Sequence, residues 1–353
     1  MKKTLTYLLL AALVLSGCAK TATSGLNDAS KRYFDAWIHV NYPDLAPTAL
    51  GAYVIEEEEG TGAALQDAET DAYVRLNYTV RSLDGTVSGT TYPYLAKQLG
   101  EYSETEWYGP VIWSRADGSL YAGVDEMLSS MKIGGKKKTV IPGWLLTGSR
   151  YDTAQEYIDN VSGGSPAIYE LELLEAISDT DQWELDSIGR YLASNFPEVS
   201  LADSLKYGFY YIQKKAPQPI GTSSDDDDDE EESDAGFPRD STIYINYTGR
   251  LLNGQVFDTT IEDTAKVYGL YSSSNSYEPI SVNYNYEDYS QITITSDKSS
   301  VIDGFAYMIW RMGAYEEGTG IFYSKLGYSY SGSGSSIPAY SPLRFDIEVV
   351  DQP

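Results

Sequence analysis

The sequence contains one cysteine and one histidine in 353 residues, Cys18 and His39. A single cysteine cannot form a disulfide within the chain. Zinc sites need several Cys or His ligands, and a Ser-His-Asp triad needs a histidine beside its nucleophile. The shortage therefore excludes zinc sites built from Cys and His and argues against such a triad. His39 falls in a helical pattern, where we expect a surface or half-buried position.

Basic residues are also few, because Lys and Arg total 25 against 52 Asp and Glu, a net charge of −27. Such a chain repels phosphate backbones, so nucleic acid is not an expected partner. Residues 225–232 are eight consecutive carboxylates, which repel one another and predict a solvated linker. A calcium site is the alternative, although the run lacks the spacing of an EF-hand loop.

Long apolar runs are missing as well. The longest, residues 5–15, is too short for a bilayer, which needs about 20 residues. It follows two lysines and ends in LSGC at Cys18, which resembles the lipobox of bacterial lipoproteins. The resemblance implies a signal peptide over 1–17, a lipidated Cys18, a tether over 18–28 and anchoring without a membrane span. Ala19 favours the outer membrane of the bacterial envelope. The alternative is an ordinary secretory signal with an incidental cysteine.

One stretch of the sequence occurs twice. Residues 76–91 read LNYTVRSLDGTVSGTT and residues 245–260 read INYTGRLLNGQVFDTT. Both alternate apolar and polar residues around a DG or NG turn, a pattern that predicts a β-hairpin. The second copy has Phe257 and Asp258 where the first has Ser88 and Gly89.

The repeat extends over most of the chain. Helical patterns over 29–40 and 182–195 both end in Asn-aromatic-Pro, and each unit closes with a strand that follows a Ser-Pro pair. We therefore predict an α+β protein of two units, 29–178 and 179–353. The second comprises a helix over 182–195, an acidic linker over 222–238 and a core over 240–351.

A tyrosine-rich segment, 267–289, separates parts of the second core. Loops of this length tend to be functional or disordered. Its tyrosines suit a stacking platform for sugars or peptides, or the outer face of an edge hairpin.

The second core resembles FKBP-type peptidyl-prolyl isomerases. The matching motifs, in chain order, are YTG at 247–249, LNGQVFDTT at 252–260, VIDGF at 301–305, LGY at 326–328, and Ile337-Pro338 leading to Leu343, Phe345 and Glu348.

This resemblance implies a curved antiparallel sheet wrapped on a short helix, with a hydrophobic pocket between them. The implied catalytic positions are Tyr247, Phe257, Asp258, Tyr328 and Phe345. The implied substrate-binding positions are Ile292, Val301, Ile302, Phe305 and Ile337. Phe305 replaces the family's usual pocket-floor tryptophan. For Phe257, Val301, Ile302 and Phe345, core packing alone is the alternative.

The chemistry of X–Pro rotation suits these residue types. The barrier of about 18–20 kcal/mol comes from amide resonance, which the twisted transition state loses. An apolar pocket therefore disfavours the planar, more polar ground state more than the twisted one. Tyr328 would donate to a substrate carbonyl and Ile302 would offer its backbone N–H. No cofactor or metal is needed.

The first unit keeps the scaffold signals and has lost the pocket residues. We thus expect an isomerase and folding helper for exported proteins, active in the second unit, with proline-containing segments as partners. The alternative is a non-catalytic lipoprotein that binds peptide or glycan. Asp-Thr-Ala triplets at 152–154 and 263–265 resemble O-glycosylation sites of some Bacteroidetes and suggest such a source.

Overall fold

The computed structural model describes residues 25–218, 237 and 241–352. The predicted signal peptide, Cys18, most of the tether and the acidic run lie outside these residues. Within the described part of the chain, no helix is both long and apolar enough to cross a membrane.

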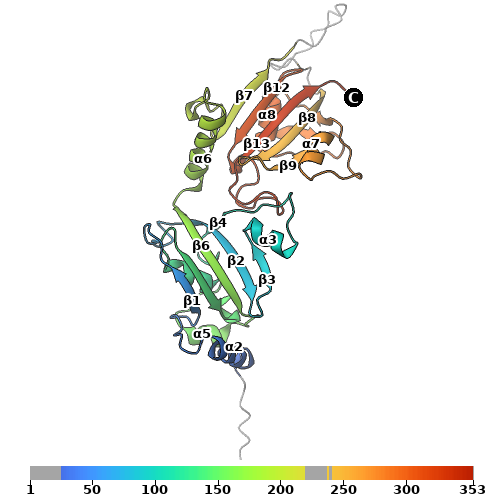
Figure 1. The fold of residues 1–353 in the computed structure, drawn as a ribbon. Coiled ribbons are helices and arrows are strands. Elements are labelled where there is room, and N and C mark those ends of the chain that lie inside the picture. The colour runs from blue at the N-terminus through green and yellow to red at the C-terminus, as the bar shows by residue number, and fades with distance from the viewer. Residues whose placement is uncertain (1–24, 219–236, 238–240, 353) are drawn as a thin grey trace, which may run out of the picture.

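The first unit contains one antiparallel sheet, in the order β1-β5-β6-β2-β3 with β4 also paired to β2 (Figure 1). Its elements are α2 (Asp28–Asn41), β1 (Tyr53–Glu58), β2 (Tyr73–Ser82), β3 (Val87–Thr90), α3 (Pro93–Leu99), β4 (Val111–Ser114), α4 (Ala122–Ser129), β5 (Lys136–Ile141), η1 (Gly143–Leu145), α5 (Ala154–Asn160) and β6 (Ala167–Ile177).

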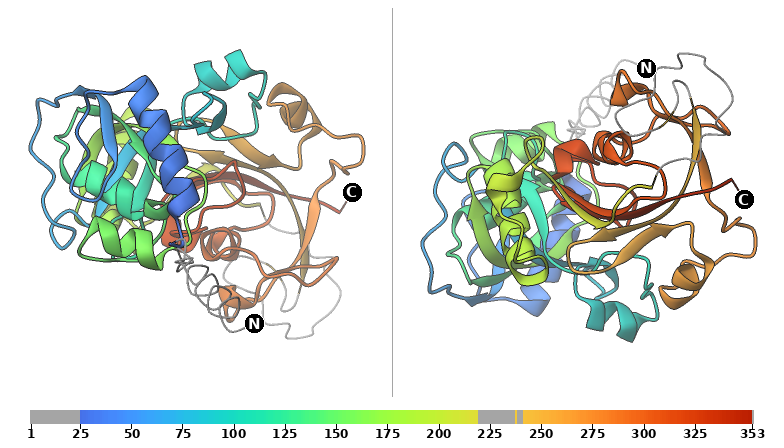
Figure 2. Two further views of the ribbon diagram at one scale, coloured as in Figure 1. Left: turned by 90° about the horizontal axis from the view of Figure 1, so that it is seen from below. Right: turned by 90° about the horizontal axis from the view of Figure 1, so that it is seen from above.

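The second unit repeats this layout, with the sheet order β7-β12-β13-β8-β10-β11 and β9 also paired to β8. Its elements are α6 (Thr180–Asn195), η2 (Leu201–Asp203), β7 (Phe209–Lys215), β8 (Thr242–Leu251), β9 (Val256–Thr259), α7 (Glu262–Val267), β10 (Ile280–Asn283), η3 (Tyr289–Gln291), β11 (Thr293–Ile294), α8 (Asp303–Arg311), β12 (Glu317–Phe322), η4 (Ser324–Leu326) and β13 (Leu343–Val350). Figure 2 shows each unit as its own lobe. The predicted α+β class is confirmed.

Strand register makes the duplication exact at the level of residues. Val80 of β2 pairs with Gly89 and Tyr169, and Gly249 of β8 pairs with Asp258 and Phe345. Position 80 in the first unit therefore corresponds to position 249 in the second.

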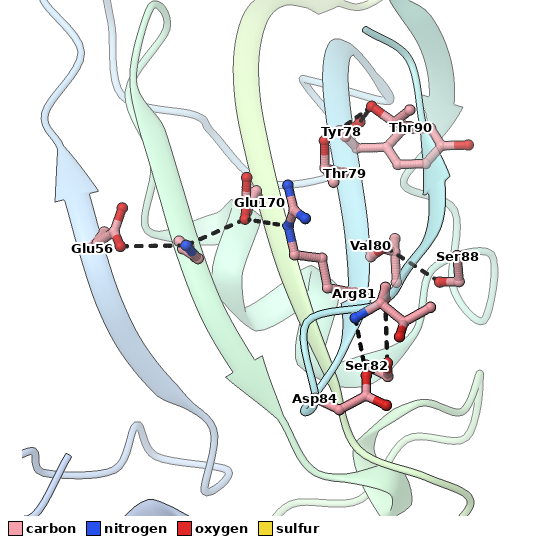
Figure 3. Close-up of polar contacts among 12 residues, drawn as sticks. Glu56, Tyr78, Thr79, Val80, Arg81, Ser82, Asp84, Ser88, Thr90 and Glu170 are labelled. Carbon is pink, nitrogen blue, oxygen red and sulfur yellow. Dashed lines mark hydrogen bonds and ion pairs between the residues drawn. The ribbon is translucent and has the colours of Figure 1, made fainter. Parts of the chain in front are cut away.

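The outer face of each sheet carries a matching carboxylate and arginine. In the first unit, Arg81 and Lys138 contact Glu170 at 3.0 and 3.3 Å, and Lys138 continues to Glu56 (Figure 3). In the second, Arg250 lies 3.5 Å from Asp346 at the corresponding register. The duplicated pair supports one sheet design for both units.

The short helix of each unit packs directly on the sheet. On α8, Phe305, Met308 and Ile309 are buried at helical spacing. A Cβ added to Gly304 would lie 2.5 Å from the ring of Phe322, so only glycine permits this approach. Gly123 holds the same position on α4, where an added Cβ would lie 2.5 Å from Ile141.

The three lysines of β5 differ in burial. Lys136 and Lys138 pair with carboxylates on the outer face, but Lys137 is 4 % exposed. Its Nζ lies 2.9 Å from Glu57 and 2.6 Å from Ser130 Oγ. Burial is tolerated because the charge has a carboxylate and a hydroxyl as partners.

The tyrosine-rich segment is partly a shared feature of both units. Tyr271 and Tyr277 stack with centroids 5.5 Å apart, and Tyr102 and Tyr108 of the first unit stack at 5.1 Å. In both loops the second hydroxyl accepts from the N–H of a serine one residue after the first tyrosine. The segment is therefore not an insertion as a whole. Relative to the first unit, the added stretch lies between β10 and α8.

The edge-hairpin expectation is correct for the backbone and wrong for the tyrosines. β10 and β11 pair at the sheet edge, but the segment's tyrosines precede β10 or lie in the connection after it. Tyr284 is 3 % exposed and donates to the carbonyl of Trp310, while Tyr289 packs edge-on against Tyr307. These side chains are fixed by separate internal contacts and form no common platform.

The units touch through loops at their facing ends. The N–H of Trp107 donates to the carbonyl of Ser335 at 2.8 Å. Tyr73 and Tyr340 pack edge to face at 5.4 Å. These contacts bring the loop after η4 of the second unit against the first unit.

Candidate functional site

The hairpin of β8 and β9 places a tyrosine and a carboxylate at one edge of the second sheet. The hydroxyl of Tyr247 donates to Oδ2 of Asp258 at 2.6 Å. Burial, followed by the charge of Asp258, raises the pKa of Tyr247, so its hydroxyl remains a donor at neutral pH. Burial and Asp258 likewise raise the pKa of Tyr328. The hydrogen bond between Tyr247 and Asp258 and the effect of Asp258 on Tyr328 place the three groups at one polar corner, and their catalytic roles stay a prediction.

Aromatic rings adjoin this corner. Phe345 lies at the centre, with its centroid 5.0 Å from Phe305, 5.6 Å from Phe257 and 6.1 Å from Tyr247. The rings meet edge to face or tilted, the arrangements that aromatic quadrupoles favour. Phe305 and Phe345 are buried, whereas Phe257 is half-buried and Asp258 is exposed. The cluster is thus apolar inside and open to solvent at the hairpin.

Helix α8 begins at the other side of the cluster. Ile302 is its N-cap residue and, with Val301, packs half-buried against the core of the second unit. The helix then carries Phe305 one turn later onto the rings. The start of α8 therefore brings the predicted positions Val301, Ile302 and Phe305 to the site.

Ile292 and Ile337 are the two predicted positions on irregular segments. Ile292 follows η3 and is 1 % exposed, and Ile337 is 3 % exposed in the loop after η4. Both belong to the same core as Phe305 and Phe345. Their contact with a substrate remains a prediction.

Two residues of the site were not assigned roles from the sequence. A Cβ added to Gly249 would lie 2.5 Å from the ring of Phe257 and 3.0 Å from that of Phe345, so this glycine makes room for both rings. Phe322 stacks on Phe345 at 5.8 Å, nearly parallel. Gly249 is the last residue of the YTG motif, so this motif could have identified it as a site residue. Phe322 sits in an apolar strand and has no distinguishing signal.

The equivalent place in the first unit has different chemistry. Tyr78 corresponds to Tyr247, but Ser88 and Gly89 stand where Phe257 and Asp258 are. Tyr169 replaces Phe345 by register. The first unit therefore lacks the carboxylate and the ring that the second presents at its hairpin.

The arrangement in the second unit suits non-covalent catalysis. An apolar surface of rings, with tyrosine hydroxyls and a carboxylate at its rim, can hold a small apolar ring and donate a hydrogen bond to a neighbouring carbonyl. These groups orient and desolvate a bound segment without forming a bond to it.

Comparison with known proteins agrees with this geometry. Residues 236–350 match the family described as FKBP-type peptidyl-prolyl cis-trans isomerase. A search of curated proteins finds no matching sequence.

Solved structures were matched as well. The three FKBP domains of wheat FKBP73 match at 15 % identity and a TM-score of 0.27, over 85 % of this chain and 94 % of that one. A peptidyl-prolyl cis-trans isomerase from Pseudomonas syringae matches at 17 % and 0.30, over 50 % of this chain and 98 % of its own. Both TM-scores are low, so neither match places a residue here. Residues 236–350 of the second unit therefore match the FKBP-type peptidyl-prolyl cis-trans isomerase family, and the ordered motifs and the ring cluster lie within this matched stretch.

Proposed function

We propose that this protein catalyses cis-trans isomerisation of X–Pro bonds through its second unit and assists the folding of exported proteins. The observation that carries the proposal is the polar corner of Asp258, Tyr247 and Tyr328 beside the ring cluster centred on Phe345. Asp258 is exposed and accepts the hydroxyl of Tyr247 at 2.6 Å, which fixes this tyrosine beside the ring cluster. Core packing alone does not explain why these three polar groups lie together.

In the proposed mechanism, the proline ring rests on Phe257, Phe305 and Phe345. Tyr328 and the backbone N–H of Ile302 donate to carbonyls of the bound segment, and Asp258 fixes Tyr247. Because the twisted amide is less polar than the planar one, the apolar surroundings stabilise it relative to the ground state. Cofactors and metals have no part in this mechanism.

The proposed setting is the bacterial envelope, with the chain held to a membrane, the outer one by preference, through a lipid on Cys18. This part rests on the sequence at the N-terminus alone. Labelling with a radioactive or alkyne fatty acid in the native host tests it. Wild-type chain should incorporate the label and a Cys18→Ser chain should not.

Asp258→Ala provides the test of the catalytic proposal. We expect kcat/KM on a short proline peptide to fall about tenfold, because the loss of one charge-assisted hydrogen bond is worth about 1.4 kcal/mol in the transition state. The melting temperature should change little, since Asp258 is exposed. The measurement is a protease-coupled assay on the full chain. Wild-type activity equal to that of Asp258→Ala and Phe257→Ala would contradict the proposal.

A second candidate function, non-catalytic peptide binding, is favoured by one observation. A cavity of about 650 Å³ lies in the first unit at the place that corresponds to the isomerase site. The glycan-binding form of this alternative loses support, because the tyrosines of the 267–289 segment are held in separate contacts.

A further inference from the structure

The cavity of the first unit is walled by aromatic rings from both halves of the chain. Tyr78, Trp113 and Tyr169 come from the first sheet, and Tyr330 and Tyr340 come from the loop after η4 in the second unit. Its volume of about 650 Å³ falls in the range of small-ligand sites, about 300–1,000 Å³.

The cavity exists because the first unit has smaller side chains at three positions. Ser88 stands for Phe257 and Gly89 for Asp258 by strand register. Val124 stands for Phe305, since both lie three residues after the N-cap of the short helix. Figure 3 shows Ser88 across the hairpin from Val80, with its hydroxyl donating to that residue's carbonyl at 3.3 Å. The smaller side chains at these positions leave room for the cavity.

The lining is uncharged, in a chain with a net charge of −27. Among the described residues around the cavity, none is Asp, Glu, Lys, Arg, Asn or Gln. Its floor is apolar and buried, with Ile112, Leu120 and Val124 each at most 8 % exposed. Burial raises the pKa of Tyr169 to about 12, so this ring also stays neutral.

This chemistry selects the class of ligand. The lining carries the hydroxyls of five tyrosines and three serines, which can pair with part of a sugar. The sugar hydroxyls that face the buried floor of Ile112, Leu120 and Val124 would still lack partners, at about 1–3 kcal/mol each. A charged side chain would lose its hydration without gaining an ion pair. An aromatic side chain loses little hydration on burial and gains contacts with the rings of the lining.

The loop from the second unit connects this cavity to the isomerase site. Tyr328, at the start of the loop, is close enough to Asp258 for that carboxylate to raise its pKa. Tyr330 lines the cavity two residues later, a span of at most about 7 Å along the backbone. The N–H of Trp107 holds Ser335 of the same loop against the first unit. The loop that supplies Tyr330 and Tyr340 to the cavity therefore also carries Tyr328 of the proposed isomerase site.

We infer that the first unit binds an aromatic side chain of an unfolded, uncharged polypeptide segment in this cavity, next to the site that acts on proline. The inference rests on the proposed function only for the source of the segment, an exported protein. A chain anchored by an aromatic residue would then present nearby X–Pro bonds to the second unit at high local concentration.

The test is calorimetric titration of the full chain with an uncharged ten-residue Gly/Ser peptide that carries a central Tyr-Phe pair. We expect the Kd to rise at least tenfold with Ser88→Trp, which fills the cavity from an exposed hairpin position. Tyr330→Ala should raise the Kd about threefold or more. The expected effect is smaller because the Tyr330 ring is 72 % exposed, and its loss removes only one wall of the cavity. Tyr33→Ala, a ring 58 % exposed on α2, is the control and should bind as wild type does.

Three outcomes overturn the inference: an Ala-Ala peptide binding as tightly as Tyr-Phe, Ser88→Trp binding unchanged, or a neutral oligosaccharide displacing the peptide. Isomerase activity on a tetrapeptide too short to reach the cavity is measured in parallel. Peptide binding without isomerase activity would support the inference while contradicting the proposed function. On a longer substrate with an aromatic residue beside its proline, Ser88→Trp should raise KM and leave kcat unchanged.

Discussion

Gly249→Val should reduce isomerase activity about 100-fold. The new Cβ would lie 2.5 and 2.6 Å from two atoms of the Phe257 ring and 3.0 Å from Phe345. These distances are shorter than any van der Waals contact, so the half-buried Phe257 must leave its place. A displacement of about 1 Å in a positioning group can cost about 100-fold in rate. The free energy of unfolding should fall by about 1–3 kcal/mol, as for other overpacked sites.

The first unit supplies the matched double variant for this experiment. It carries Val80 and Ser88 at the positions of Gly249 and Phe257, so a valine is accommodated where the facing ring is absent. Gly249→Val combined with Phe257→Ser should recover most of the lost stability and none of the activity. The non-additive part of the double-mutant cycle then measures the ring clash.

Gly164→Val is the control, because a Cβ at Gly164 meets nothing within 4 Å. The protease-coupled assay and denaturant unfolding provide the two readouts. If Gly249→Val kept wild-type activity, or if the double variant recovered activity along with stability, Phe257 would have no role in catalysis.

The same pair of units shows what a sequence can predict. The hairpins at 76–91 and 245–260 and the closing strands were predictable, because period-two alternation around DG and NG turns fixes both pairing and register. Their equivalence then predicted which positions of the first unit lack a pocket residue. The polar corner of Asp258, Tyr247 and Tyr328 followed from ordered motifs.

Other features depend on contacts that the local sequence does not encode. Lys137 is buried because Glu57 and Ser130, from two other elements, lie beside it. Alternation along β5 alone could not reveal those partners.

The cavity of the first unit could not be predicted from the sequence, for a related reason. Tyr330 and Tyr340 belong to the second unit, so only the placement of the two units creates the site. The tyrosine-rich segment was assigned to the second unit alone, although the loops 101–110 and 270–279 share a Tyr-Ser pair followed at the same spacing by Tyr-x-Pro. Their equivalence becomes visible in the stacked pairs Tyr102–Tyr108 and Tyr271–Tyr277.

Glu184 gives the second large expected effect, on stability as a function of pH. This carboxyl on α6 is 1 % exposed and accepts hydrogen bonds of 2.6 Å from both the N–H and the hydroxyl of Ser324. Burial raises its pKa from 4.5 to about 7, and the hydrogen bonds from Ser324 oppose that rise only in part. Nearby, Asp181 raises the pKa further, while Lys325, paired with Asp181, lowers it.

The direction of the effect follows from proton binding. Between pH 4.5 and 7 the folded state holds a proton on Glu184 that the unfolded state has released, so the free energy of unfolding falls as pH rises. Above pH 7 the carboxylate is buried at a cost on the order of 3 kcal/mol, the equivalent of that difference in pKa. Below pH 4.5 both states are protonated and the cost is absent.

Glu184→Gln should remove this dependence, because the amide keeps an acceptor for the N–H of Ser324 and a polar partner for its hydroxyl without carrying a charge. We expect the variant to equal wild type in stability near pH 4.5 and to exceed it by up to about 3 kcal/mol near pH 8. Denaturant unfolding across this pH range measures the difference. Glu198→Gln, at an exposed position after the same helix, should leave the profile unchanged. A constant offset between Glu184→Gln and wild type at every pH would mean that Glu184 does not titrate between the folded and unfolded states.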